Sequence, residues 1–210
     1  VGMGKDFYEQ IAVCKKIYDM ASEVTGLDIP KICFTENEQI HITEYTQIAM
    51  LTTEAAILAA LREKGMQSQV HAGLSLGEYG ALLASGVLSL EDAFRVVRER
   101  GILMQEAVPQ GGAMSAVLGM DGEKIAEICE EITGIVSVAN YNCPGQVVIT
   151  GEKEAVDEAV EHLKATGAKR CIPLQVSGPF HSPMLKEAGE KLGNVLEEIT
   201  LRDISIPYLT

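Results

Sequence analysis

Apolar residues along the chain follow two different spacings, which separate it into two regions. Residues 1–111 and 178–210 carry long apolar stripes at helical spacing, whereas residues 112–177 carry shorter stretches that change between strand and helix spacing. A helical region that flanks a mixed one on both sides predicts one domain with a smaller domain inserted into it. The elements expected in the flanking region are helices at 5–22, 43–64, 76–85, 90–107 and 184–200, with short strands at 69–72 and 204–209.

The middle region has a regular order of expected elements. They are strand, helix, strand, strand, helix and strand, at 113–118, 122–133, 135–139, 146–150, 152–166 and 170–176, with a turn at 140–145. This is the order of a ferredoxin-like unit. The sequence therefore predicts an α/β protein in which a ferredoxin-like subdomain, residues 112–177, interrupts a core made of residues 1–111 and 178–210.

Composition and charge exclude several classes of function. The net charge of −13 argues against nucleic-acid binding, which relies on a basic surface. No apolar run approaches the roughly 18 residues of a membrane span, and we expect no signal peptide. The five cysteines show no C-x-x-C spacing, which is typical of reduced thiols in the cytoplasm, and no Cys/His cluster indicates a metal. We expect a cytoplasmic protein without a metal or cofactor.

A glycine-flanked serine follows the strand at 69–72. Gly73, Ser75 and Gly77 have the G-x-S-x-G spacing of a nucleophile elbow, in which a tight strand-to-helix turn exposes the serine hydroxyl. We expect both glycines to be needed because a Cβ there would bring strand and helix into collision. The N-terminus of the next helix would stabilise an oxyanion. The motif alone is equally consistent with an ordinary turn and a capping serine.

One arginine lies where an apolar residue is expected. At 100° per residue, Arg100 falls at the centre of the apolar stripe of the helix at 90–107, and Arg95 and Arg98 fall on the opposite face. A buried guanidinium keeps its proton and needs an anionic partner. That partner is either a nearby carboxylate of the chain or a bound anion. The side chain could also extend to water.

A histidine completes the candidate chemistry. His181 lies between Pro179 and Pro183, in the loop where the predicted insert returns to the core. A serine nucleophile needs a base within hydrogen-bond reach, and rigid loops often carry such groups. We expect the other three histidines to be structural or solvated; they are His41, His71 and His162.

Four ordered motifs give the chain a resemblance to a known family. They are GLSLGE at 73–78, RG at 100–101 followed by MQEAVP at 104–109, NYNCPGQVVI at 140–149 and GPFH at 178–181. The chain resembles the malonyl-CoA:acyl carrier protein transacylases, which are related to the acyltransferase domains of polyketide synthases. The resemblance implies an α/β-hydrolase-like core with a ferredoxin-like insert, and it covers essentially the whole chain.

The resemblance also implies roles for individual residues. Ser75 would be the acylated nucleophile, His181 its base, Arg100 the ligand of the malonyl carboxylate, and the Leu76 N–H an oxyanion donor. The implied partners are malonyl-CoA and acyl carrier protein. The remaining implied positions are Phe180 for malonyl rather than methylmalonyl choice, Asn142 for substrate binding, and Lys169 with Arg170 for the approach of coenzyme A or the carrier, where ordinary solvated charge is the alternative.

Two departures from the family pattern affect the expectations. The family has histidine where Leu74 stands, but that histidine is not the base. The family also has a strand and a G-Q-G-x-Q loop before residue 1 and further residues after 210, so we expect a chain that is incomplete at both ends. A chain without that glutamine would lose an oxyanion donor worth roughly 2.7–4 kcal/mol. A serine (thio)ester hydrolase and a truncated, non-catalytic acyltransferase fragment stay open as alternatives.

Overall fold

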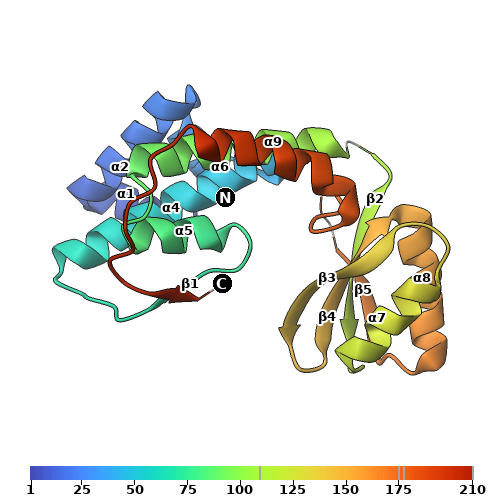
Figure 1. Cartoon of the computed structure of the whole chain (residues 1–210). Coiled ribbons are helices and arrows are strands. Elements are labelled where there is room, and N and C mark those ends of the chain that lie inside the picture. Colours follow the sequence, from blue (N-terminus) through green and yellow to red (C-terminus); the bar gives the residue numbers. More distant parts are fainter. Residues whose placement is uncertain (109, 175, 177, 210) are drawn as a thin grey trace. The chain divides into compact units, whose positions relative to one another are not determined.

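The computed structural model describes residues 1–108, 110–174, 176 and 178–209. The chain divides into two compact units: unit 1 is Val1–Leu103 with Leu192–Thr210, and unit 2 is Met104–Lys191. Figure 1 shows unit 1 as mainly helical and unit 2 as a sheet with helices. Four positions used in the sequence interpretation lie outside the described residues: Pro109 of the MQEAVP motif, Gln175 of the expected last strand, Ser177 at the end of the expected insert, and Thr210.

Unit 1 is built around the long helix α4. Its core includes Tyr18, Ile48, Leu51 and Phe94, all fully buried, which come from three different helices. The spacing of these residues along each helix explains why the stripes were visible in the sequence. The helices are α1 (Lys5–Gln10), α2 (Ala12–Thr25), α3 (Ile29–Phe34), the 3-10 helix η1 (Gln39–His41), α4 (Thr43–Glu63), α5 (Gly77–Ala84) and α6 (Leu90–Ala107), whose last turn belongs to unit 2.

Several boundaries in unit 1 differ from the expected ones. The expected helix at 5–22 is two helices, because Ile11 is extended (φ −122°, ψ 113°) and separates α1 from α2. Helix α3 and η1 were not predicted, since both are short and follow a stretch rich in turn residues. The helix at 90–107 is correct, and Ser89 caps it: its Oγ accepts a hydrogen bond from the Asp92 N–H at 3.0 Å.

A short parallel pair of strands leads into the serine turn. Strand β1 (His71–Ala72) pairs with β6 (Tyr208–Leu209), and both are shorter than expected. Before β6 the chain bonds to the end of α5, where the Ser205 N–H donates to the Ser85 carbonyl at 2.9 Å. Figure 1 shows β1 beside α5, so the segment between them is the turn that carries Ser75.

Unit 2 contains an antiparallel sheet of the order β3-β4-β2-β5. Val117, Ile125, Ile149 and Leu163 form the fully buried core between one face of this sheet and its two helices. The unit's elements are β2 (Gly112–Leu118), α7 (Gly122–Glu131), β3 (Val136–Cys143), β4 (Gln146–Glu152), α8 (Lys153–Thr166), β5 (Arg170–Pro173), the 3-10 helix η2 (Pro183–Leu185) and the start of α9 (Lys186–Glu197), whose end belongs to unit 1.

The turn expected at 140–145 is much tighter in the structure. Strand β3 continues to Cys143, and only Pro144 and Gly145 separate it from β4. Gly145 has φ 77°, which a glycine adopts without strain. Asparagines and a proline close together indicated a longer turn, but the pairing of β3 with β4 extends the strand through them.

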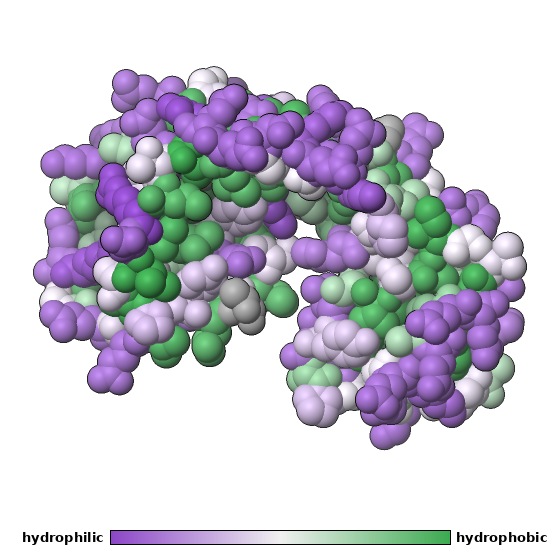
Figure 2. All heavy atoms as spheres, viewed as in Figure 1, coloured by the Kyte–Doolittle hydropathy of each residue, from purple (hydrophilic) through white to green (hydrophobic). Residues whose placement is uncertain are grey.

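Hydrophobic residues also reach the surface of unit 1, as Figure 2 shows. Val70, Leu74, Ile204 and Leu209 are each at least half exposed, and they lie in β1 and β6 or in the segments that flank them. Within the described part of the chain, no helix is both long enough and apolar enough to cross a membrane.

Candidate active site

Ser75 occupies a strained turn between β1 and α5. Its φ is 54°, a left-handed conformation that L-residues other than glycine rarely adopt, and such strain clusters at functional sites. Gly73 makes the turn possible, since a Cβ there would lie 1.9 Å from the Gly77 carbonyl oxygen. The expectation for the other glycine was wrong: a Cβ at Gly77 would meet no atom within 4 Å. One glycine, not two, therefore allows the elbow to form.

The two glycines provide a matched test of the elbow. We expect Gly73→Ala to lower the free energy of unfolding by at least about 3 kcal/mol, because its Cβ would collide with backbone atoms that cannot move aside cheaply. Gly77→Ala should change it by less than about 0.5 kcal/mol. Urea unfolding followed by circular dichroism measures both, and equal stability of the two variants would contradict this account of the turn.

The N-terminus of α5 lies directly after the serine. Leu76 is the N-cap residue of α5, with helical φ and ψ of −56° and −39°. The amide N–H groups of the next residues form hydrogen bonds within the turn; that of Gly77, for example, donates to the Leu74 carbonyl at 2.9 Å. Among the described residues, the Leu76 N–H donates to no acceptor. That amide is thus available as a donor at the positive end of a helix, next to the serine.

Arg100 reaches the serine from α6. Its side chain is buried, at 8% exposure, and its Nη2 donates a hydrogen bond to the Ser75 Oγ at 3.1 Å. The prediction that Arg100 lies in the buried stripe is confirmed. Arg98, which was expected on the opposite face of the helix, is partly buried and forms an ion pair with Glu44 of α4 at 3.0 Å.

The other contacts of Arg100 are with uncharged side chains. Its Nη1 donates to the Gln47 Oε1 of α4, and its guanidinium lies 5.4 Å from the centre of the Tyr79 ring. Burial lowers the pKa of the Arg100 guanidinium, and Tyr79 opposes that shift. In the described part of the chain, no carboxylate forms an ion pair with Arg100. A buried cation therefore lies beside the strained serine, bonded to the neutral Gln47 side chain, and the Glu78 carboxylate acts on it through its charge without forming an ion pair.

Gln47 and Tyr79 were not predicted from the sequence. Gln47 is 7% exposed and stands on the apolar side of α4. A polar residue inside an apolar stripe is the same signal that identified Arg100, so helical spacing could have found it. Tyr79 had no such signal, because its contact with Arg100 depends on how α5 and α6 pack. Burial raises the pKa of the Tyr79 hydroxyl, and the nearby charge of Arg100 opposes the shift.

His181 occupies a second strained position, in unit 2. Its φ is 61°, and its side chain is exposed. The turn is held on both sides: the Ser182 N–H donates to the Pro179 carbonyl at 3.3 Å, and the Pro179 ring covers Gly112, where a Cβ would lie 2.3 Å away. The loop expected between the two prolines is present. Ser75 belongs to unit 1 and His181 to unit 2, and the pairing of the two stays a prediction.

Phe180 packs against the sheet of unit 2. It is half-buried and contacts the cluster of Met114, Ala116 and Val148. These residues lie on the face of the sheet opposite the α7 and α8 core, since they alternate with Val117 and Val147 along β2 and β4. The packing fixes the residue next to His181, and its proposed role in acyl-group choice stays a prediction.

The remaining predicted residues lie at the edges of unit 2. Asn142 is exposed near the end of β3 rather than in a turn. Lys169 and Arg170 are exposed at the start of β5, where the Lys169 stem covers Gly119 and its N–H donates to the Leu118 carbonyl at 2.9 Å. These contacts fit ordinary surface residues as well as they fit a binding role.

Comparison with known proteins connects this geometry to a family. The model of the acyl transferase domain matches residues 1–210. The malonyl CoA-acyl carrier protein transacylase of Bacillus subtilis (strain 168) is 45% identical over 215 residues, a match that spans 100% of this chain and 68% of that protein. The chain belongs to the malonyl-CoA:acyl carrier protein transacylase family.

Solved structures of this transacylase family agree in fold. An acyl carrier protein S-malonyltransferase from Vibrio cholerae is similar with a TM-score of 0.95 and 42% identity, covering 100% of this chain and 70% of that one. A malonyl-transacylase solved in complex with a type II polyketide synthase acyl-carrier protein has a TM-score of 0.96 and 43% identity, with the same coverage. The coarse prediction of an α/β protein is therefore correct.

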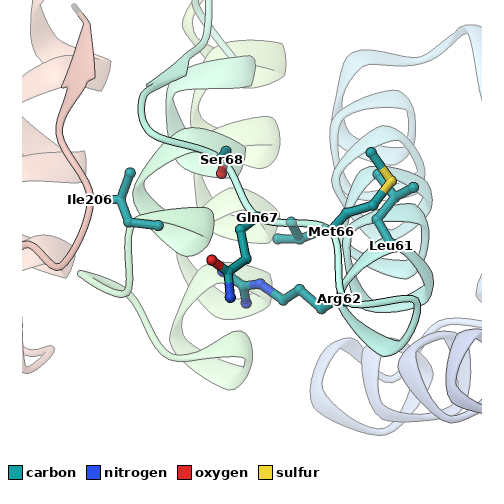
Figure 3. A pocket seen from close by; sticks show the side chains of 8 residues that line it. Leu61, Arg62, Met66, Gln67, Ser68 and Ile206 are labelled. Atoms are coloured by element: carbon teal, nitrogen blue, oxygen red, sulfur yellow. The ribbon is translucent and has the colours of Figure 1, made fainter.

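A cavity of this transacylase homologue lies away from Ser75 and Arg100. It has a volume of about 470 Å³ and lies between the end of α4 and the segment before β6 (Figure 3). Its lining includes Arg62, Ser68 and Ile206 but neither Ser75 nor Arg100. Ser68 Oγ lies 2.6 Å from His71 Nε2, and His71 Nδ1 lies 2.8 Å from Ser85 Oγ. His71 thus connects β1 to the end of α5, which fits a structural histidine.

Proposed function

We propose that the chain transfers a malonyl group from coenzyme A to the phosphopantetheine thiol of an acyl carrier protein, through an ester on Ser75. The observation that carries this proposal is the buried Arg100, whose Nη2 lies 3.1 Å from the Oγ of a serine in a strained turn and whose direct side-chain contacts include no carboxylate among the described residues. A guanidinium binds a carboxylate through two parallel charge-assisted hydrogen bonds. An acyl group that ends in a carboxylate would complete the site, and a malonyl group has one.

The first half of the reaction forms the ester. His181 accepts the Ser75 hydroxyl proton as the Oγ attacks the thioester carbonyl carbon of malonyl-CoA. The Leu76 N–H stabilises the resulting oxyanion. The C–S bond then breaks, and the coenzyme A thiolate leaves with the proton from His181. Arg100 keeps the malonyl carboxylate in place throughout, so that the carbonyl carbon stays within reach of the Ser75 Oγ.

The second half returns the enzyme to its starting state. His181 accepts the proton of the carrier's phosphopantetheine thiol, and the sulfur attacks the malonyl ester. The C–O bond to Ser75 breaks, and the serine oxygen regains its proton from His181. The proposed chemistry needs only side chains and backbone of the chain, and no cofactor.

The finer fold assignment belongs to the same proposal. We take residues 1–111 and 178–210 as an α/β-hydrolase-like core and residues 112–177 as a ferredoxin-like subdomain. The parallel pair β1–β6 beside the elbow helix supports the first part. The antiparallel order β3-β4-β2-β5, with two helices against one face, supports the second. Contacts of unit 2 extend beyond this subdomain into the last turn of α6 and the start of α9.

The partner and the location follow from the same function. The relative solved with a carrier protein supports an acyl carrier protein as acceptor. Lys169 and Arg170 are exposed and basic, and we propose them as contacts for coenzyme A or the carrier. The five free cysteines support a cytoplasmic location.

Steady-state kinetics with malonyl-CoA and a holo-acyl carrier protein test this function. A malonyl-serine intermediate requires coenzyme A to leave before the carrier reacts, so double-reciprocal plots at several carrier concentrations should be parallel. Malonyl-carrier should be the product, measured by mass spectrometry of the carrier. Intersecting lines would contradict the intermediate. Release of free malonate without malonyl-carrier would favour a hydrolase instead.

A further inference from the structure

The interface between α4 and α6 holds two arginines in different ways. Gly101 lets the helices approach closely, since a Cβ there would lie 2.9 Å from the Glu44 Cα. Arg98 faces a carboxylate of α4, with 3.0 Å between its Nη1 and the Glu44 Oε2. Arg100 faces an amide of the same helix, donating from its Nη1 to the Gln47 Oε1. Glu44 and Gln47 are three positions apart on α4 and therefore lie on the same face.

Of these two arginines, the more buried one forms no ion pair with a carboxylate of the described residues, and Glu78 acts on it only through the longer-range effect of its charge. Arg98 is half-buried, and its charge is paired with that of Glu44. Arg100 is buried, and burial of a cation without an anion in direct contact is unfavourable. A carboxylate at position 47 would offset the unfavourable burial of the Arg100 charge. The same interface already contains a carboxylate at position 44, that of Glu44. Gln47 instead supplies a hydrogen-bond acceptor and no charge.

We propose that Gln47 is a specificity-determining positioning residue, which fixes the Arg100 guanidinium beside Ser75 without neutralising it. The full positive charge then stays available for the carboxylate of the acyl group. A carboxylate in place of Gln47 would compete with the substrate for the same guanidinium and repel it as a like charge. This inference rests on the proposed function, because it assumes that Arg100 binds the malonyl carboxylate.

The test compares Gln47→Glu with Gln47→Met in single-turnover acylation by malonyl-CoA and acetyl-CoA. Gln47→Glu should lower the rate constant for malonyl acylation at limiting substrate by about 100-fold and leave acetyl acylation unchanged or faster. Gln47→Met removes the acceptor and keeps the charge. It should lower the malonyl rate by about tenfold, through weaker binding rather than a slower chemical step, and keep the preference for malonyl. Gln10→Glu, exposed on α1, is the control for added charge and should behave like the wild type.

The outcomes separate this inference from the proposed function. The inference is supported if the ratio of the malonyl to the acetyl acylation rate constant falls strongly in Gln47→Glu and not in Gln47→Met. Equal losses in Gln47→Glu and Gln47→Met, with the ratio unchanged, would overturn it and leave Gln47 a purely structural residue. If the wild type itself is not acylated by malonyl-CoA, the proposed function fails instead. Thermal unfolding checks that both variants fold. For a variant that does not react, calorimetry gives the ratio of its affinities for malonyl-CoA and acetyl-CoA, which is compared in the same way.

Discussion

Ser75→Ala is expected to lower malonyl transfer by about 10⁴-fold or more and to abolish the covalent adduct. The reason is chemical: without the Oγ there is no atom to carry the acyl group between coenzyme A and the carrier. The protein should remain folded, with a free energy of unfolding within about 0.5 kcal/mol of the wild type. Transfer is measured with radiolabelled malonyl-CoA, and the adduct by the mass of the intact protein.

Ser68→Ala is the matched control for this variant. The Ser68 hydroxyl, like that of Ser75, is hydrogen-bonded to a side-chain nitrogen: its Oγ lies 2.6 Å from His71 Nε2. It lies outside the elbow, and its loss should leave transfer unchanged. Full transfer by Ser75→Ala together with loss of transfer in Ser68→Ala would mean that the nucleophile had been assigned to the wrong serine.

Arg100→Ala is expected to remove the preference for malonyl groups. The malonyl carboxylate would lose the cation that lies beside Ser75, which costs about 4 kcal/mol, or roughly 10³-fold in kcat/KM. Acylation by acetyl-CoA should be unchanged or faster, because a neutral acyl group no longer leaves a buried charge unpaired. The measurement is kcat/KM for both thioesters.

Two further variants test whether charge or geometry matters. Arg100→Lys keeps the charge but lacks the planar fork, so it should recover only part of the malonyl activity. Arg95→Ala removes an exposed arginine of the same helix, which pairs with Glu91 at 3.0 Å, and should leave the preference intact. Malonyl preference that survives in Arg100→Ala would contradict the role given to the buried cation.

The elbow and Arg100 could be predicted because their signals are local. A glycine two residues before a serine, between a strand and a helix, restricts the turn within a few residues. Gly73 fulfils that role, whereas Gly77 does not, since the close contact depends on how β1 enters α5. Arg100 was visible because helical spacing alone places it inside the apolar stripe, and the structure buries it there.

The contacts that give Arg100 its environment could not be read in the same way. Gln47 and Tyr79 meet Arg100 through the packing of α4, α5 and α6, which helical spacing within one segment does not determine. The same limit explains Arg98, which turns toward Glu44 instead of solvent. The strain at His181 also had no sequence signal beyond its two flanking prolines.

Fold elements were predictable where one periodicity extends over many residues. Helices α4 and α6 match the expected ranges closely, because each carries an apolar stripe over several turns. The errors occur where local turn residues and tertiary pairing disagree. The asparagines at 140 and 142 indicated a turn, yet pairing with β4 keeps them in a strand, and Ile11 interrupts a helix that its neighbours favour.

Mapping of the acyl adduct tests the central claim most directly. The full chain is incubated with malonyl-CoA, quenched in acid before carrier protein is added, digested and sequenced by tandem mass spectrometry. The account predicts one malonyl group, on the peptide containing Ser75, which disappears when holo-carrier protein is added before the quench. An adduct on another residue, or a protein that transfers malonyl groups without any adduct, would contradict it.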